Sequence, residues 1–195
     1  MTQPSLLSRA VFRLIFWIYR LRGWQVSGRL PKDRKFVLVG APHTSNWDFP
    51  VFLGATQDIG IRPSYLGKHS LFSWPLKRFM VDMGGIPINR SKPGNYVQQV
   101  AAAFDSRDEL ALVIAPEGTR HSDGKWRSGF YHIAIAAGVP VVIAWIDRSR
   151  RQIGIGPAVT PSGDYRADLK KIADWYRSVW PDQRRFDQMD REPQA

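Results

Sequence analysis

A histidine and an aspartate five positions apart, His43 and Asp48, stand where the chain changes from a strand pattern to a helix pattern. The apolar run before them, 36–40, predicts a buried β-strand, and Pro50 after them suits the first turn of a helix. If the two side chains meet, the carboxylate fixes the imidazole tautomer and raises its basicity, and the second ring nitrogen can take a proton. The pair is therefore a candidate general base.

The spacing of this pair restricts the local backbone. On a continuous helix, positions i and i+5 point about 140° apart, so the side chains meet only if residues 44–46 form a turn and the helix begins near Trp47 or Asp48. The intervening Thr, Ser and Asn favour turns and helix caps. The alternative is that Asp48 caps the helix and His43 is an ordinary loop residue, and residues 42–48 alone leave both interpretations open.

The composition is that of one folded domain. The chain has 195 residues, 44% of them hydrophobic and 23% charged, which is enough to bury a core. Strand-like and helix-like stretches alternate, which predicts a single α/β domain with a mostly parallel central sheet flanked by helices. Strands are expected within 24–35 and at 36–40, 62–68, 84–90, 110–115, 139–145 and 151–159. Helices are expected at 5–22, after Asp48, and at 71–80, 95–104, 130–137 and 164–180.

The charge balance favours anionic partners. Lys and Arg number 28 against 17 Asp and Glu, a formal charge of +11, which suits nucleic acid, anionic lipid or phosphorylated substrates. The eight Trp residues favour a membrane interface, although base stacking also uses aromatic rings. Because there is no Cys, disulfides, thiolate nucleophiles and Cys-based zinc sites are excluded. The four His lack metal-ligand spacing, so no metal site is expected.

The N-terminal segment 1–23 is predicted to be an amphipathic helix followed by a domain at 24–182 and a loose polar tail at 183–195. Arginines interrupt its apolar stretch, which disfavours both a transmembrane span and a signal peptide. The helix either packs on the domain or lies on a membrane, and we favour an anionic membrane surface. Its arginine face holds Arg9, Arg13 and Arg20, and its apolar face holds Leu7, Val11, Leu14, Ile18 and Leu21.

Three polar stretches, 42–48, 89–90 and 117–120, follow predicted strands. Because parallel strands share one carboxyl edge, these loops can converge and offer a His–Asp pair, Glu117 and two arginines. Guanidinium groups grip phosphate bidentately, so Arg90 and Arg120 suggest a phosphate-bearing ligand, although each alone is also compatible with a solvated surface charge. The chain has no P-loop, no GxGxxG between strand and helix, and no GxSxG elbow.

Four blocks occur in an order that identifies a family. His43–Asp48 resembles an HxxxxD motif, residues 85–90 (GIPINR) a second block, Glu117–Arg120 an EGTR block, and residues 139–142 (VPVV) a fourth. A Lys-containing stretch at 67–72 precedes the second block. Together, over roughly residues 24–160, they resemble the glycerolipid acyltransferase family, which includes bacterial 1-acylglycerol-3-phosphate (lysophosphatidate) acyltransferases.

The resemblance implies a role for each matching residue. His43 would be the general base on the acceptor hydroxyl, with Asp48 orienting it. The acceptor phosphate would be bound by Arg90 and Arg120, with Lys68 as a helper, and the acceptor site would be shaped by Glu117 and Gly118. The acyl donor would be an acyl-CoA or acyl carrier protein thioester and the acceptor a lyso-glycerolipid, with no covalent intermediate, no metal, no cofactor and no nucleic acid partner.

Some questions stay open from the sequence alone. Pro42 stands where many family members have Asn, so the acceptor is not specified, and a phosphate-free lyso-lipid such as an aminolipid is an alternative. A non-catalytic basic membrane-binding module is another. We expect a peripheral, monotopic protein on the cytoplasmic face of the cell membrane. Acyl-chain length, the thioester carrier, the acylated position and the oligomeric state cannot be derived.

Overall fold

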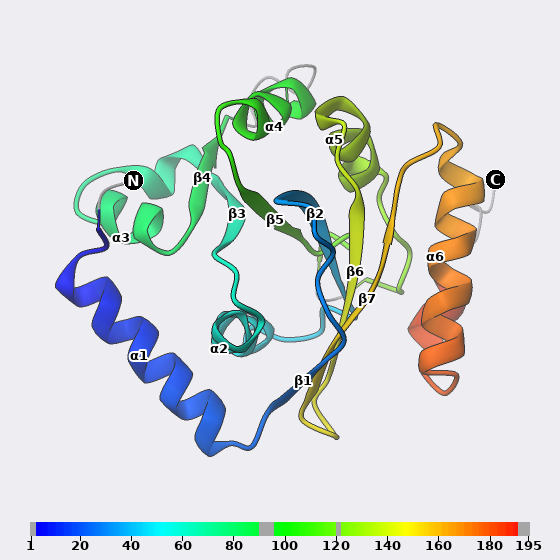
Figure 1. Ribbon diagram of the computed structural model, residues 1–195, viewed down its shortest axis with the longest axis horizontal. Helices are drawn as coiled ribbons and strands as arrows, with labels where there is room; N and C mark the ends of the chain where they lie inside the picture. The colour runs from blue at the N-terminus through cyan, green and yellow to red at the C-terminus, as the bar shows by residue number, and fades with distance from the viewer. Residues whose placement is uncertain (1–2, 90–95, 120–121, 191–195) are drawn as a thin grey trace.

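A computed structural model describes residues 3–89, 96–119 and 122–190, and it has a central seven-stranded sheet (Figure 1). The strand order is β1-β7-β6-β2-β5-β3-β4. Strands β6, β2, β5, β3 and β4 run parallel, whereas β7 is antiparallel to β6. The prediction of a mostly parallel sheet is confirmed. The strands are β1 (Gln25–Ser27), β2 (Lys35–Ala41), β3 (Pro63–Lys68), β4 (Gly85–Ile88), β5 (Leu110–Ile114), β6 (Val141–Asp147) and β7 (Gln152–Val159).

Helices cover both faces of this sheet and give three layers (Figure 1). One face is covered by α1 (Leu6–Leu21) and α2 (Asp48–Ile59), the other by α4 (Tyr96–Asp105), α5 (Gly129–Ala137) and α6 (Tyr165–Val179). The alternation along β2 produces this arrangement, because successive side chains of a strand point to opposite faces. Phe36 and Leu38 pack toward α2, whereas Val37 and Val39 join the core with α4, α5 and α6.

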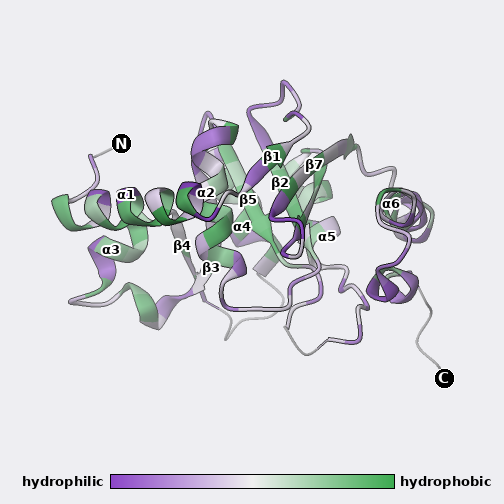
Figure 2. Cartoon of the chain, turned by 90° about the horizontal axis from the view of Figure 1, so that it is seen from below, coloured by the Kyte–Doolittle hydropathy of each residue, from purple (hydrophilic) through white to green (hydrophobic). Residues whose placement is uncertain are grey.

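Helix α1 has two apolar faces rather than one. Its inner face packs on α2, where Tyr19 lies against Gly54 so closely that a Cβ on Gly54 would come within 2.5 Å of the ring. Ser5 and Ser8 anchor its start, since the Ser5 N–H and the Ser8 hydroxyl both donate to Asp82 at 2.8 Å. An outer row of apolar side chains is exposed, and hydropathy colouring shows apolar residues along the helix (Figure 2). The outer row comprises Leu6, Leu7, Leu14, Trp17, Ile18 and Leu21. Among the described helices, none has the length and apolarity needed to span a bilayer.

Two predicted segments differ from the structure. The helix predicted at 71–80 is divided into a 3₁₀ helix η1 (His69–Phe72) and a short α3 (Lys77–Asp82), because Pro75 lacks the N–H that a continuous helix would need. Residues 183–190 are not a loose tail. They contain a 3₁₀ helix, η3 (Arg184–Gln188), whose Phe186 is buried against Tyr176 and Trp180, and Met189 is buried as well. Burial of these apolar side chains outweighs the polar character of the segment.

Candidate active site

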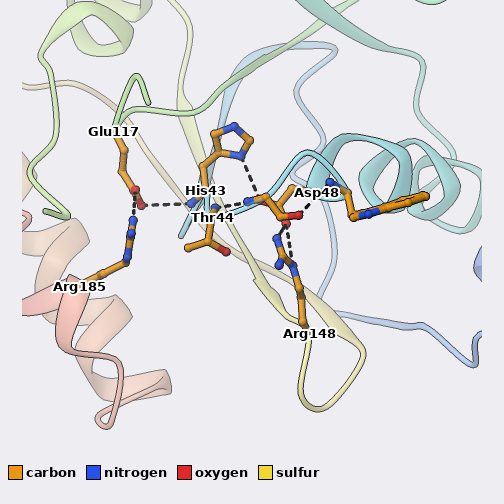
Figure 3. Close-up of polar contacts among 8 residues, drawn as sticks. His43, Thr44, Asp48, Glu117, Arg148 and Arg185 are labelled. Carbon is orange, nitrogen blue, oxygen red and sulfur yellow. Dashed lines mark hydrogen bonds and ion pairs between the residues drawn. The ribbon is translucent and has the colours of Figure 1, made fainter. Parts of the chain in front are cut away.

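The loop after β2 forms the turn that the His43–Asp48 spacing requires. Helix α2 begins at Asp48, and the backbone N–H groups of Thr44 and Ser45 both donate to Asp48 Oδ2 at 2.9 Å. The same oxygen lies 3.1 Å from His43 Nδ1 (Figure 3). Asp48 therefore closes the turn and contacts the imidazole with one carboxylate oxygen. His43 is not merely an ordinary loop residue.

The second oxygen of Asp48 is held by an arginine from a distant part of the chain. Arg148 Nε and Nη2 lie 3.0 and 2.5 Å from Asp48 Oδ1 (Figure 3). Burial favours the neutral carboxyl, but the hydrogen bonds from His43, Arg148 and the two backbone N–H groups outweigh it and lower the pKa of Asp48 from 3.8 to about 2. The carboxylate is consequently charged throughout the neutral range.

This geometry fixes the chemistry open to the imidazole. With Nδ1 directed at Asp48, the hydrogen-bonded tautomer leaves the Nε2 lone pair outward, and Nε2 has no hydrogen bond to any residue in the described ranges. The His43 side chain is 27% exposed, so a substrate hydroxyl can reach it. A histidine in this setting can remove a proton from that hydroxyl and later return it to a leaving group.

Glu117 supports the same loop from the other side. It is 2% exposed, and its Oε1 accepts the His43 backbone N–H at 3.2 Å while Oε2 accepts from Arg185 Nη1 at 2.7 Å (Figure 3). Burial raises the pKa of Glu117, and the His43 N–H and the Arg185 charge oppose that rise only in part. Glu117 thus fixes the His43 backbone, and a contact with the acceptor stays a prediction.

The other predicted site residues lie at the same sheet edge or outside the described ranges. Gly118 has φ +72°, a left-handed conformation, and a Cβ there would lie 3.1 Å from Arg127 Nε. Lys68 is the exposed last residue of β3 and pairs in register with Ile88 of β4. The described structure brings His43, Asp48 and Glu117 together. Arg90 and Arg120, predicted to bind phosphate, lie outside the described residues.

The sequence interpretation overlooked Arg148 and Arg185. Arg148 follows Asp147 at the end of β6, so the rule that polar residues after parallel strands converge would have found it had the β6 end been included. Arg185 offers no comparable signal, because it lies 68 positions from Glu117 in a segment that reads as a polar tail.

Comparisons with known proteins place this site in context. A family model described as Acyltransferase matches residues 24–147. A 1-acyl-sn-glycerol-3-phosphate acyltransferase of Haemophilus influenzae is 30% identical over 135 residues, covering 64% of this chain and 55% of its own length. One from Limnanthes alba is 25% identical over 146 residues, covering 71% and 50%. This chain thus spans about half the length of the curated relatives it matches.

A solved structure has a similar fold. The crystal structure of PlsC, the 1-acyl-sn-glycerophosphate (LPA) acyltransferase of Thermotoga maritima, superposes with a TM-score of 0.60. The match covers 96% of this chain and 81% of that one at 20% identity, and at this identity it shows the fold alone.

Proposed function

Because this chain belongs to the acyltransferase family, we propose that it transfers a fatty acyl group from acyl-CoA or acyl carrier protein to a hydroxyl of 1-acylglycerol-3-phosphate or a related lyso-glycerolipid. The observation that carries the proposal is the His43–Asp48 pair, whose Nδ1 and Oδ2 atoms are 3.1 Å apart within the matched segment. The substrate class is taken from the relatives, which are 1-acyl-sn-glycerol-3-phosphate acyltransferases.

In the proposed reaction His43 Nε2 takes the proton of the acceptor hydroxyl as its oxygen attacks the thioester carbonyl carbon. The tetrahedral intermediate collapses, the C–S bond breaks, and the departing sulfur takes the proton back from the imidazolium. The ester and the free thiol are the products, and no acyl-enzyme forms. Asp48 stabilises the imidazolium, and Arg148 and Glu117 hold the Asp48 carboxylate and the His43 backbone in place.

We assign the acceptor phosphate to Arg90, Arg120 and Lys68, as the family resemblance implies. Lys68 lies beside β4, whose last residue Ile88 is two positions before Arg90. Arg127, whose side chain lies over Gly118, adds a further positive charge to the loop that leads to Arg120. A cationic surround of this kind favours a dianionic head group over a neutral one.

An acceptor panel tests this assignment. We expect acyl-CoA or acyl carrier protein to acylate lysophosphatidate much faster than a phosphate-free lyso-lipid, because only the former can use the arginines. Arg120→Ala should raise the apparent KM for lysophosphatidate about tenfold or more, since a hydrogen bond to a charged group is lost. Products are measured by thin-layer chromatography with labelled thioester.

The control in that panel is the donor. The apparent KM for the thioester should stay unchanged in Arg120→Ala, and an effect on the donor alone would contradict the phosphate role. If a phosphate-free aminolipid is acylated as fast as lysophosphatidate or faster, the acceptor is a lipid of that class instead. If no acceptor is acylated with either donor, the chain is a non-catalytic module.

We further propose that α1 holds the protein on the cytoplasmic face of the cell membrane as a peripheral helix. Its outer apolar row includes Leu6 at 77% and Leu21 at 70% exposure. Arg9, Arg13 and Arg20 stand along one border of this row, where they can contact anionic head groups. This placement would bring a lipid acceptor to the protein without its leaving the interface.

Replacing Leu7, Leu14 and Leu21 with serine should weaken binding to phosphatidylglycerol-containing vesicles at least tenfold, because each leucine loses up to about 1.5–3 kcal/mol of burial. Vesicle sedimentation measures the partition coefficient. The matched control replaces two exposed apolar side chains on other helices, Ile135 and Val179, and should bind like the parent. Equal loss in both variants would show that α1 is not the contact.

A further inference from the structure

A cavity lies at the opposite edge of the sheet from the candidate active site. It has a volume of about 900 Å³, within the range of small-molecule sites. Phe36, Pro63 and Gly85 at the starts of β2, β3 and β4 contribute to its walls, together with α1. The proposed acyl-transfer residues instead follow the carboxyl ends of β2 and β5. The cavity is therefore separate from that site.

The walls combine apolar surface with guanidinium groups. The apolar side chains come from α1, from the segment before β2, and from the starts of β2, β3 and β4; they include Phe12, Leu30, Phe36, Ile61 and Met83. The guanidinium groups belong to Arg9, Arg13, Arg34, Arg62 and Arg107. An apolar surface bordered by several positive charges is complementary to a molecule with a hydrocarbon chain and an anionic head.

Three of these arginines are available to a ligand. Within the described ranges, Arg9, Arg13 and Arg62 form no side-chain hydrogen bond or ion pair. Arg9 and Arg13 reach the cavity from α1, and Arg62 reaches it from the segment between α2 and β3. The available positive charge of the cavity therefore comes from two separate elements.

The acidic residues of the cavity leave that charge largely uncompensated. Glu109 is paired with Arg34, and Asp82 is paired with Arg78 and also accepts from Ser5 and Ser8. Asp33 is the remaining carboxylate of the wall and is exposed in the segment before β2. One acidic group against three available guanidinium groups leaves a net attraction for anions.

We propose that this cavity binds a single-chain anionic amphiphile, with its phosphate or carboxylate on Arg9, Arg13 and Arg62 and its chain along the apolar wall. On α1, the two arginines stand between the inner face that holds Phe12 and the exposed outer row. A ligand here would contact both α1 and the amino-terminal ends of β2, β3 and β4, at a site apart from the acyl-transfer residues. The inference goes beyond the proposed function and does not require it.

The test counts bound ligands in the full chain. In a His43→Ala background and without an acyl donor, so that no acyl transfer takes place, equilibrium dialysis with short-chain lysophosphatidate below its micelle concentration should give two molecules per chain. Adding Arg13→Ala and Arg62→Ala should weaken one of the two sites about tenfold or more and leave the other unchanged. The matched control adds Arg166→Ala and Lys170→Ala on α6, which remove the same charge on the other side of the sheet, and should retain both sites.

Competition with further ligands shows which head group and which chain the cavity requires. Decanoate should displace one lysophosphatidate, glycerol 3-phosphate should displace none from the cavity because it has no chain, and lysophosphatidylcholine should compete weakly because its head is zwitterionic. Two sites unaffected by Arg13→Ala and Arg62→Ala, or a single site that these two substitutions leave unchanged, would overturn the inference, whereas a single site that they weaken would support it. If the cavity site is present but the parent chain acylates no acceptor, only the proposed function fails.

Discussion

Replacing His43 with alanine is expected to lower the rate of acyl transfer by about 10²–10⁴-fold, the usual contribution of a positioned general base. The residual rate should persist because substrate positioning by the rest of the site is retained. The chain should stay folded, since the His43 side chain is 27% exposed and its contact in the described structure is with Asp48. The backbone N–H that Glu117 accepts is kept in the alanine variant.

The measurement is the initial rate with saturating thioester and lysophosphatidate, together with the thermal midpoint of each variant. His132→Ala is the matched control, because His132 is an exposed histidine on α5. The control should keep the parental rate. Unchanged turnover in His43→Ala, with the same thermal midpoint, would remove His43 from the mechanism and leave the family assignment without its proposed base.

The sequence predicted the layered fold well because its signals are local. The apolar run at 36–40 alternates between two buried faces, and Gly138 ends α5 with the left-handed conformation that favours glycine. Contacts made over long separations could not be derived in the same way. Helix α1 shows why: its inner face is recognisable only once Tyr19 is seen against Gly54, so packing on the domain and an exposed apolar surface appeared as alternatives when both occur.

In the candidate site, too, the local features could be predicted from the sequence and the contacts between distant residues could not. Thr, Ser and Asn allow the turn that joins His43 to Asp48 but left it as one of two interpretations, and the structure forms it. The supports of that turn come from positions 148 and 185, both beyond the segment 24–147 that the family model matches. Arg185 reaches Glu117 because η3 packs on the core through Phe186. The burial of a few apolar side chains within a polar segment depends on tertiary packing, so the local sequence pattern does not reveal it.

Replacing Asp48 with asparagine should affect both turnover and acid stability. Turnover should fall by on the order of 10²–10⁴-fold, because an amide cannot stabilise the imidazolium or fix the productive tautomer. The pKa of Asp48 is lowered from 3.8 to about 2 in the folded chain, and this shift contributes to the free energy of unfolding of the parent. Since the folded-state pKa is the lower one, this contribution of about 2 kcal/mol is present above pH 4 and is lost as the pH falls toward 2.

Urea unfolding between pH 2 and pH 6 gives the free energy of unfolding of the parent and of Asp48→Asn. The difference between the two measures the contribution of Asp48, because the effects of the other carboxylates are the same in both chains and cancel. The parent should lose its advantage over the variant as the pH drops from 4 to 2. Asp168→Asn is the matched control, because Asp168 is also buried, its pKa is also about 2, and it lies at the start of α6 against Tyr131 and Ser162. For both variants, the stability advantage of the parent should shrink as the pH drops from 4 to 2, but only Asp48→Asn should lose turnover. Loss of turnover in both would mean that unfolding, rather than the orientation of His43, explains the effect.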